Sequence, residues 1–418
     1  MSVKITDGKK DAGLYSNHCR PEGFTIPETS AKNGCCPQDS PQVSCSSGNT
    51  AEQGEPCCGP PPSAPSSIHE KPGYTICRYV SGFLNTPVGF VPRVSTSLDL
   101  SDHLGTLYAR SGFFRNDYKV APGLYAAGTP DQNSPVLVTA NYKLTFDTIR
   151  TRLKRSNVWL LVIDTRGINV WCAGGKSLFS AKEVVRLVRQ TGLARIISHR
   201  KLILPQLAAN GVSAQSVRKA CGFEVVWGPI RAEDIEPFIE NNLKAAPKMR
   251  QVTFDTLERL TLIPVELNFA WKPSLLAILT VFLLSGIGPD IFSLTDAVSR
   301  GSMLIAAFFT GVCTGAILTP ALLPWLPFRM FSLKGVIAGL AGLIPLTFFF
   351  REKAAGIEIF ALLFMGLAVS SYLAMNFTGS TPFTSPSGVE KEMKKSIPIQ
   401  GIAIAAGIIF WVAAAFVG

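Results

Sequence analysis

The sequence lacks the signatures of several common protein classes. No G-x-G-x-x-G or Walker loop joins an apolar run to an amphipathic one, so a nicotinamide, flavin or nucleoside triphosphate site is poorly supported. No short apolar segment follows the first basic residues, which predicts no cleavable secretory signal. The net charge of +11 comes without a basic run interleaved with aromatic residues, so we expect no nucleic-acid partner.

Charge is scarce in the second part of the chain, where long apolar runs replace it. This unevenness divides the chain into a soluble half and a membrane half. We predict a disordered, cysteine-containing tail over 1–72, an α/β domain over 73–246, a linker over 247–272 and a transmembrane domain over 273–418. The tail is rich in Ser, Pro, Gly, Asn and Gln and has too few large apolar residues to form a core.

Six of the ten cysteines lie in the predicted tail, and four of them form two adjacent pairs. They are Cys19, Cys35, Cys36, Cys45, Cys57 and Cys58. Adjacent thiolates are good ligands for soft metal ions, because two of them can share one ion with little chain to close. The alternative is a low-complexity extension whose cysteines have no role, and the sequence leaves both readings open.

Short apolar runs alternate with amphipathic stretches between 73 and 246. The runs 135–143, 158–167, 194–200 and 223–229 are predicted strands, and helical spacing of apolar residues separates them. Strands joined through helices of this length favour a parallel sheet with helices on its faces, which is a Rossmann-like α/β domain.

Ligands of such sheets bind beyond the carboxyl ends of the strands. The residues predicted there are Thr139, Asn141, Asp164, Thr165, Ser198, His199, Gly228 and Pro229. Most are short and polar or lack a side chain, as the lining of a crevice would be. Asn141 and Asp164 have an equally good alternative role as caps of the helices that follow them.

The stretch GINVWCAGGK, residues 167–176, lies between a predicted strand end and a predicted helix start. Unpaired backbone N–H groups and the helix dipole there favour a thiolate at Cys172. Ala173, Gly174 and Gly175 remove side-chain bulk, so that a large flat ligand can approach, and Lys176 adds positive charge. Two other readings remain open: a buried structural cysteine, or a nucleophile with His199 as its base.

Five apolar segments in the second half are each close to the roughly 20 residues that a bilayer requires. We place these helices near 273–294, 302–323, 333–350, 355–376 and 398–417. The loops on the side of the soluble half carry more Lys and Arg, which predicts an inner-membrane protein with its soluble half in the cytoplasm. Glycines at G-x-x-x-G spacing favour close packing within one bundle over a homodimer. With almost no charge inside the spans, the bundle resembles an anchor more than a transporter.

The motif N-V-W-C-A-G-G-K, residues 169–176, resembles the cap-helix signature of the mercury-methylating corrinoid proteins, the membrane-anchored members of the gene pair that makes methylmercury. The segment 122–147 is similar to the corrinoid-binding domain shared with the large subunit of the corrinoid iron–sulfur protein. The segment 376–393 is similar to a further part of that wider family. The resemblance covers about 73–418, and it does not extend to the tail.

The resemblance implies a cobalamin-type corrinoid bound base-off, with Cys172 as the lower axial ligand of cobalt. It implies that the rest of the motif lies against the corrin: Asn169, Val170, Trp171, Ala173, Gly174, Gly175 and Lys176. Thr139, Asn141, Asp164 and Thr165 are expected to contact the ring amides or the nucleotide tail, on the ground of their strand-end positions alone.

The implied activity is transfer of a methyl group from the methyl-cobalt corrinoid to Hg(II), which makes methylmercury. The implied partners are a ferredoxin-like protein with two [4Fe-4S] clusters and a methyl donor linked to methyltetrahydrofolate. Two alternatives stay open: a membrane-tethered corrinoid carrier of methyl groups in one-carbon metabolism, and a membrane-anchored soft-metal binding protein that uses the tail thiols. We also hypothesise that the paired tail cysteines capture Hg(II).

Overall fold

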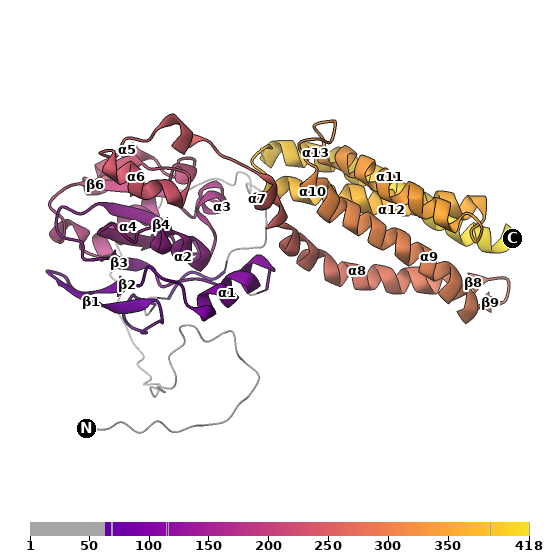
Figure 1. Ribbon diagram of the computed structural model, residues 1–418, viewed down its shortest axis with the longest axis horizontal. Helices are drawn as coiled ribbons and strands as arrows, with labels where there is room; N and C mark the ends of the chain where they lie inside the picture. The colour runs from indigo at the N-terminus through magenta and orange to yellow at the C-terminus, as the bar shows by residue number, and fades with distance from the viewer. Residues whose placement is uncertain (1–62, 68–69, 114, 116, 385, 418) are drawn as a thin grey trace, which may run out of the picture.

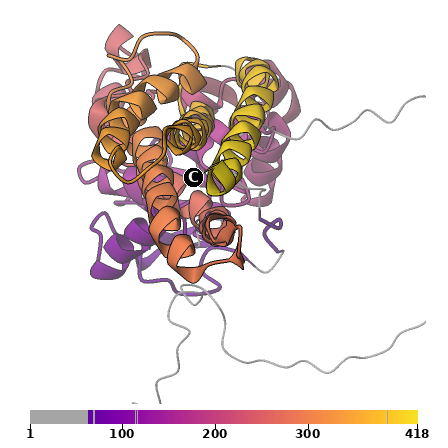
Figure 2. The same cartoon turned by 90° about the vertical axis from the view of Figure 1, so that its right-hand side faces the viewer.

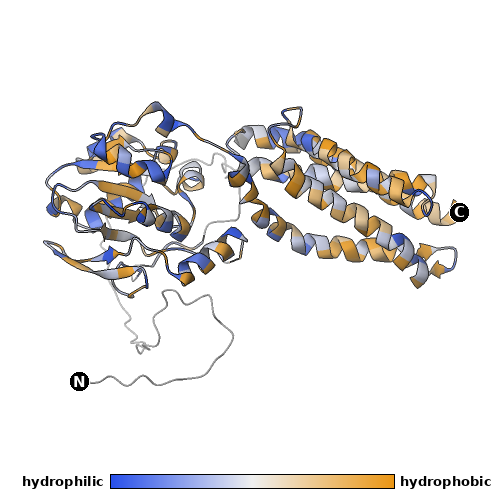
Figure 3. Ribbon diagram, in the orientation of Figure 1, coloured by the Kyte–Doolittle hydropathy of each residue, from blue (hydrophilic) through white to orange (hydrophobic). Residues whose placement is uncertain are grey.

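The computed structural model describes residues 63–67, 70–113, 115, 117–384 and 386–417 (Figure 1). The six tail cysteines and most of the predicted tail lie outside the described residues. The described chain forms an α/β domain followed by a bundle of long helices (Figure 1). Polar residues are spread over the helices of the α/β domain, whereas the bundle helices are predominantly apolar (Figure 3).

A seven-stranded sheet forms the centre of the α/β domain in the described part of the chain. Its strands are β1 Val80–Thr86, β2 Gly89–Val94, β3 Gly123–Ala127, β4 Val136–Ala140, β5 Val158–Ile163, β6 Lys201–Leu204 and β7 Glu224–Trp227. Their order across the sheet is β1-β2-β3-β5-β4-β6-β7. β4 and β5 are buried along their whole length, which explains why both read as continuous apolar runs.

The sheet is mixed, which corrects the prediction of a parallel one. β5, β4, β6 and β7 pair in parallel, but β3 pairs antiparallel with β5, and β1 pairs antiparallel with β2. The sequence patterns of β1, β2 and β3 did not predict them. β1 alternates between exposed and half-buried positions and contains Gly82 and Asn85, and three of the five residues of β3 are Gly or Ala, so neither has a strong strand pattern.

Helices cover both faces of this sheet. They are α1 Leu100–Arg110, α2 Lys143–Thr151, α3 Val170–Gly175, α4 Ala181–Gln190, α5 Ala214–Cys221 and α6 Ile235–Glu240, with single 3-10 turns at Leu193–Arg195, Gln206–Ala208, Ala232–Asp234 and Pro247–Arg250. α3, α4 and α5 contribute to the core on one face, and α2 and α6 to the core on the other.

The predicted strand at 194–200 is wrong. Ile196 and Ile197 are buried in the core from a turn that follows the 3-10 helix Leu193–Arg195, and the strand begins only at Lys201. Ser198 and His199 therefore lie before β6, at its amino end. The apolar pair misled the prediction because two adjacent buried residues fit a turn as well as a strand.

Five helices of the described chain are long and apolar enough to cross a membrane. The elements of this region are α7 Thr256–Leu260, α8 Ile263–Ser285, β8 Ile287–Gly288, β9 Ile291–Phe292, α9 Leu294–Val312, a π-helical segment Cys313–Leu318, α10 Thr319–Ala321, α11 Phe331–Phe350, α12 Gly356–Asn376, the 3-10 turn Phe377–Ser380 and α13 Pro386–Val417. The view along the bundle shows the helices side by side in front of the α/β domain (Figure 2).

The third and fourth helices match their predicted ranges closely, but the others are displaced. α8 begins ten residues before the predicted start at 273, so much of the predicted linker is helical, and a short hairpin, β8–β9, occupies part of the range predicted as helix. Pro273 marked the predicted boundary, yet α8 continues through it. α13 begins at Pro386, inside the predicted loop, because a polar first section continues the helix beyond the apolar one.

Small residues bring the bundle helices together, as the glycine spacing predicts. A Cβ atom at Gly335 would lie 2.6 Å from the Ser370 carbonyl oxygen of α12, and one at Gly315 would lie 2.5 Å from the same atom. Polar groups also join the helices. Arg300 pairs with Glu358 at 2.7 Å between α9 and α12, and Trp411 donates to Ser285 between α13 and α8. Such interhelical hydrogen bonds stabilise membrane bundles.

Candidate functional site

The strand order places a topological switch point between β4 and β6. From β4 the chain moves to β5 on one side, then crosses back to β6 and β7 on the other. Ligands of open α/β sheets bind beyond the carboxyl ends of the strands at such a point. The short helix α3, which we call the cap helix, leaves β5 and packs against the turn Gln206–Ala208 that follows β6, so it lies over this edge.

Local hydrogen bonds define where the cap helix begins and ends. The Asn169 side chain accepts a hydrogen bond from the Cys172 backbone N–H at 2.9 Å, which makes Asn169 the N-cap. Arg166 and Gly167 before the helix, and Ser177 after it, have positive φ angles of 55°, 72° and 56°. The helix is therefore a single short turn held between two sharp reversals of the chain.

Asn141 organises the loop that leads into the cap helix. Its side-chain oxygen accepts from the Thr165 N–H, the Thr165 hydroxyl and the Gly167 N–H, each at 3.0 Å, and its amide donates to Asp164 at 3.0 Å. Asp164 also accepts from the Ser66 N–H at 2.7 Å. Asn141 and Thr165 are fully buried. The structure thus brings the predicted residues Asn141, Asp164 and Thr165 together. Their hydrogen bonds are made with one another and with backbone N–H groups of the chain.

The cap helix has an inner and an outer face. Val170 and Ala173 are buried in the core of the domain. Gly174 also faces inward, because a Cβ atom there would lie 2.4 Å from the Asn210 side-chain oxygen. Two of the three small residues predicted to give clearance to a ligand are therefore small for packing within the domain. Gly175 is exposed, and a Cβ atom there would meet nothing closer than 4.0 Å.

The outer face carries Trp171, Cys172, Gly175 and Lys176. Trp171 is 40% exposed, which is unusual for so large an apolar side chain, and Cys172 is half-buried. Gly175 leaves open space beside them. A thiol, an exposed indole and an open backbone on one face are suited to a flat partner that lies against the helix.

Burial raises the pKa of the Cys172 thiol above its ordinary value. Lys176, Arg115 and a hydrogen bond with Asn169 act in the opposite direction, and burial outweighs them. Burial therefore opposes the thiolate that the position of Cys172 at a helix start is predicted to favour. The helix of six residues is too short to offset desolvation of the charged sulfur.

Three buried hydroxyl groups of the α/β domain have no hydrogen-bond partner among the residues that the structure describes. They belong to Ser66, Thr139 and Tyr142. Tyr142 follows Asn141 at the end of β4, and its ring centre lies 5.8 Å from the Arg115 guanidinium carbon. Burial raises the pKa of Tyr142, and Arg115 acts to lower it. Buried polar atoms in folded proteins are usually hydrogen-bonded, so these hydroxyls are open to a water molecule or to a ligand.

Sequence reasoning missed Tyr142 and Arg115. Tyr142 ends the apolar run 135–143 and reads as one more core aromatic, so its position one residue after Asn141 is the signal that could have found it. Arg115 lies more than 50 residues before Cys172 in the sequence, and no local pattern connects the two. Only the fold brings this cation toward the cap helix.

The alternative pairing of Cys172 with His199 is not assembled. The His199 ring contacts the Ser134 carbonyl oxygen at 2.9 Å, immediately before β4 begins. β4, β5 and β6 are parallel, so this is the amino edge of the sheet, a strand length of roughly 17 Å from the carboxyl edge. Gly228 and Pro229, in contrast, do follow β7 at the carboxyl edge, and both are buried.

The described residues fit a cofactor whose metal ion is already coordinated by the cofactor itself. No group of three or more His, Cys, Asp or Glu side chains among them could hold a metal ion. Cys172 alone could supply one ligand to a metal that is already chelated, and the unpartnered hydroxyls of Thr139 and Tyr142 could bond to polar groups around a large ring. The residues present are therefore compatible with a corrinoid.

Part of the α/β domain is similar in sequence to known proteins. The profile of the family described as CO dehydrogenase/acetyl-CoA synthase delta subunit matches residues 97–239. The gamma subunit of the acetyl-CoA decarbonylase/synthase complex of Methanocaldococcus jannaschii is 39% identical over 132 residues, which is 31% of this chain and 26% of that protein. The corrinoid/iron-sulfur protein large subunit of Moorella thermoacetica is 28% identical over 127 residues, 30% of this chain and 28% of that protein. The chain thus spans about a quarter of the length of these relatives.

Proposed function

We propose that the chain is a membrane-anchored corrinoid protein that transfers methyl groups. The observation that carries the proposal is Cys172, presented on the outer face of a capped helix at the switch point of the sheet. The similarity of residues 97–239 to subunits of acetyl-CoA synthase complexes, one of them named a corrinoid/iron-sulfur protein, supports it. The five apolar helices supply the anchor.

When bound, the corrinoid supplies a cobalt that carries the methyl group. In this proposal the Cys172 sulfur would hold the cobalt, in place of the nucleotide base of the corrinoid. Asn169 holds the helix that positions this sulfur, and Lys176 and Arg115 stabilise its thiolate, since both act to lower its pKa. Trp171, Gly175 and Lys176 would lie against the ring.

In this proposal the buried residues around the cap helix hold the helix and its loop in place, and the exposed residues contact the ring. Val170, Ala173 and Gly174 fix the helix on the domain, and Asn141, Asp164 and Thr165 fix the loop before it. Of the predicted strand-end contacts, Thr139 is the one with an unused hydroxyl, and we add Tyr142 to it.

We further propose that the methyl acceptor is Hg(II). The support is the match of residues 169–176 to the cap-helix signature of mercury-methylating corrinoid proteins. A thiolate at Cys172 would supply strong electron donation to the cobalt, which suits transfer of the methyl group with its bonding electron pair to a soft electrophile such as Hg(II), with the cobalt left as Co(III). The test is to supply the full-length chain with corrinoid, reductant, methyl donor and Hg(II), and to measure methylmercury. Its absence under conditions where the protein becomes methylated would overturn the assignment of the acceptor.

The second candidate is a methyl carrier of one-carbon metabolism. The names of the relatives favour it, since they are subunits of acetyl-CoA complexes. The same assay separates the two: a carrier would exchange methyl groups with methyltetrahydrofolate-linked donors and yield no methylmercury. In either case we propose an inner-membrane location with the α/β domain in the cytoplasm, and a ferredoxin-like partner with two [4Fe-4S] clusters as the reductant.

The cysteine-bearing tail joins the described chain beside the cap helix. The Ser63 hydroxyl donates to the Arg166 carbonyl oxygen at 2.8 Å, in the loop that precedes Asn169. Cys57 and Cys58 are six and five residues before Ser63, a reach of at most about 22 Å. We propose that the tail thiols capture Hg(II) for the site. Replacing all six tail cysteines with serine should reduce methylmercury formation at limiting Hg(II). Equal rates of formation by the variant and the unchanged chain would overturn the proposed capture of Hg(II).

A further inference from the structure

The first section of α13 extends beyond the membrane-spanning part of the helix. α13 has 32 residues, which corresponds to about 48 Å, whereas the hydrocarbon core of a bilayer is about 30 Å thick. The apolar sequence begins at Ile397 and fills that thickness. Lys391 and Lys395 therefore lie roughly 3 to 9 Å outside the hydrocarbon, at the level of the lipid headgroups.

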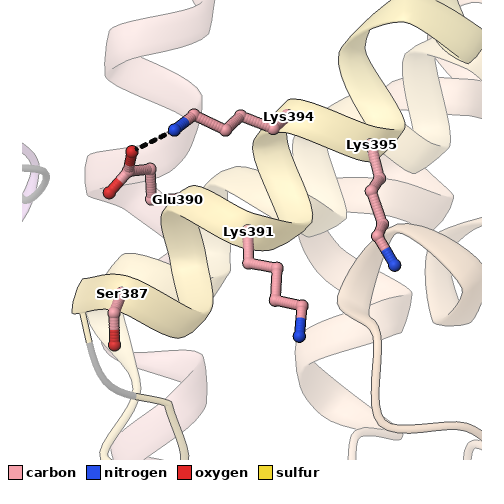
Figure 4. Close-up of a pocket in the computed structure, with 5 residues that line it drawn as sticks. All are labelled: Ser387, Glu390, Lys391, Lys394 and Lys395. Carbon is pink, nitrogen blue, oxygen red and sulfur yellow. Dashed lines mark ion pairs between the residues drawn. The ribbon is translucent and has the colours of Figure 1, made fainter.

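Residues of this section line a surface hollow of about 390 Å³. They are Ser387, Glu390, Lys391, Lys394 and Lys395 (Figure 4). The first section of α13, which carries these residues, lies at the end of the bundle next to the α/β domain (Figure 1). The charged lining of this hollow distinguishes it from the hollow formed by Ile357, Phe360, Phe364 and Phe410, which is apolar.

The charges of this section divide into two groups. Glu390 and Lys394 form an ion pair at 2.6 Å and neutralise each other. Lys391 and Lys395 extend to the other side of the helix, on the same side as each other (Figure 4), and among the described residues neither has an ion-pair partner. Glu392 cannot supply one, because it is buried on the inner face and accepts the Ser332 backbone N–H of α11.

Two ammonium groups four residues apart on one helix face repel each other and destabilise the helix unless an anion lies between them. Their position selects the kind of anion. At headgroup depth the abundant anions are the phosphates of acidic phospholipids, and a basic hollow beside a membrane helix is suited to bind one.

We propose that Lys391 and Lys395 form a binding site for the phosphate headgroup of an anionic phospholipid. One headgroup phosphate between the two ammonium groups removes their repulsion, and the acyl chains continue along the exposed apolar face of α13 that begins at Ile397 and Ile399. The site would fix this end of the bundle, which adjoins the α/β domain, in one leaflet.

The experiment compares lipid retention by the full-length chain and by the double variant Lys391→Gln/Lys395→Gln. Each protein is placed in nanodiscs of phosphatidylcholine with 30% phosphatidylglycerol, released, and examined by native mass spectrometry. We expect the unchanged chain to retain one phosphatidylglycerol, and the double variant to retain it at least about tenfold more weakly in titration, because each basic residue near the surface contributes severalfold in affinity.

Two control variants separate this site from general charge and from the neighbouring ion pair. Glu390→Gln/Lys394→Gln removes the pair and should retain the lipid. Lys182→Gln/Lys219→Gln removes the same net charge from exposed positions of the α/β domain and should also retain it. Equal retention by the Lys391/Lys395 variant, with its thermal unfolding unchanged, would overturn the proposal.

Inorganic phosphate separates a lipid headgroup from a free anion. If millimolar phosphate binds in the same lysine-dependent way and displaces the lipid, the site is one for soluble phosphate and the lipid assignment is wrong. Retention of phosphatidylcholine as strong as that of phosphatidylglycerol would also overturn it, because the site would then not recognise the negative charge.

Discussion

Two polar clusters flank the start of α2, and they differ in whether their hydrogen bonding is complete. The open cluster contains Cys172, Tyr142 and Thr139, with the cations Arg115 and Lys176 nearby, and two of its buried hydroxyls have no partner in the described part of the chain. The closed cluster contains Asp102, Lys143, Asp147 and Arg150, which pair with one another at 2.5 to 2.7 Å. Tyr142 and Lys143 are adjacent in sequence, yet they belong to different clusters.

We infer that the closed cluster stabilises the fold and that the open cluster is available to a ligand. In the closed cluster two carboxylates face two cations, and Arg150 donates further to the backbone oxygens of Ser95 and Ser97, so no site remains for a ligand. Its interactions link α1, α2 and the segment between β2 and α1. The open cluster has buried hydroxyls that lack a partner among the described residues, and Thr139 and Tyr142 lie at the end of β4, near the edge where the strand order predicts a ligand. We therefore expect changes to the two clusters to affect different measurements.

The largest effect is expected from Cys172→Ala. It removes the proposed metal ligand from the outer face of the cap helix, so methyl transfer should fall to background. The thiol makes no packing contact that holds the core, so thermal unfolding should hardly change. The visible absorption spectrum of bound corrinoid should show loss of the sulfur ligand. Cys221→Ala is the matched control, since Cys221 is also half-buried and bonds only within α5. Full transfer by Cys172→Ala would remove the axial-ligand assignment.

The next largest effect is expected from Asp147→Ala in the closed cluster. It leaves Lys143 and Arg150 buried with one carboxylate between them, which typically costs about 3–5 kcal/mol of unfolding free energy. Denaturation of the full-length chain in detergent, followed by hydrogen exchange of α2, measures it. Glu233→Ala is the control, because its pairs are about half-exposed and contribute about 0–1 kcal/mol. Similar losses from both variants would contradict the closed character of the cluster.

Acid should weaken the closed cluster in a defined direction. Burial acts to raise the pKa of Asp102, but Lys143 and Arg150 overcome it and hold the pKa below its ordinary value. A carboxyl group with a lowered folded-state pKa contributes stability above its unfolded pKa of about 3.9, and this stability is lost as the pH falls through the folded-state pKa. The Asp102 contribution is therefore complete at neutral pH.

The sequence predicts the features of the fold and of the two clusters that depend on neighbouring residues. It does not predict those that depend on residues far apart in the chain. β4, β5 and the cap-helix motif were predictable, because continuous burial and a contiguous eight-residue signature are local features. The roles of Asn141 and Asp164 were not, since their bonds reach residues 20 to 100 positions away. β1 and β3 escaped prediction because small and half-exposed residues leave a weak pattern. The start of α8 was misplaced because a proline and a lysine in the helix resemble a boundary.

A smaller effect is expected from Tyr142→Phe in the open cluster. If its unpartnered hydroxyl bonds to the corrinoid, the loss of one hydrogen bond should weaken corrinoid binding about fivefold. Unfolding stability should be unchanged or slightly higher, because an unsatisfied buried hydroxyl is removed. Binding is measured by titration of the full-length apoprotein with corrinoid.

Tyr125→Phe is the matched control for this prediction. Its hydroxyl is also buried, but it donates to the Ala121 carbonyl oxygen at 2.8 Å. The control should therefore lose about 1 kcal/mol of stability and keep its corrinoid affinity. The reverse result, with Tyr142→Phe losing stability and keeping affinity, would place Tyr142 in the core and not in the site.

The smallest effect is expected in the pH dependence of Cys172 alkylation. Burial raises the pKa of this thiol, so iodoacetamide labelling of the corrinoid-free chain should increase with pH to a midpoint above the ordinary value of about 8.5. Arg115→Gln removes a cation that acts to lower the pKa, so the midpoint should move higher. Arg110→Gln should change it less, because Arg110 acts on Tyr142 and is not among the groups with the largest effects on the Cys172 pKa. Peptide mass spectrometry follows this thiol separately from the others. Equal midpoints for the Arg115 variant and the unchanged chain would mean that Arg115 does not belong to the open cluster.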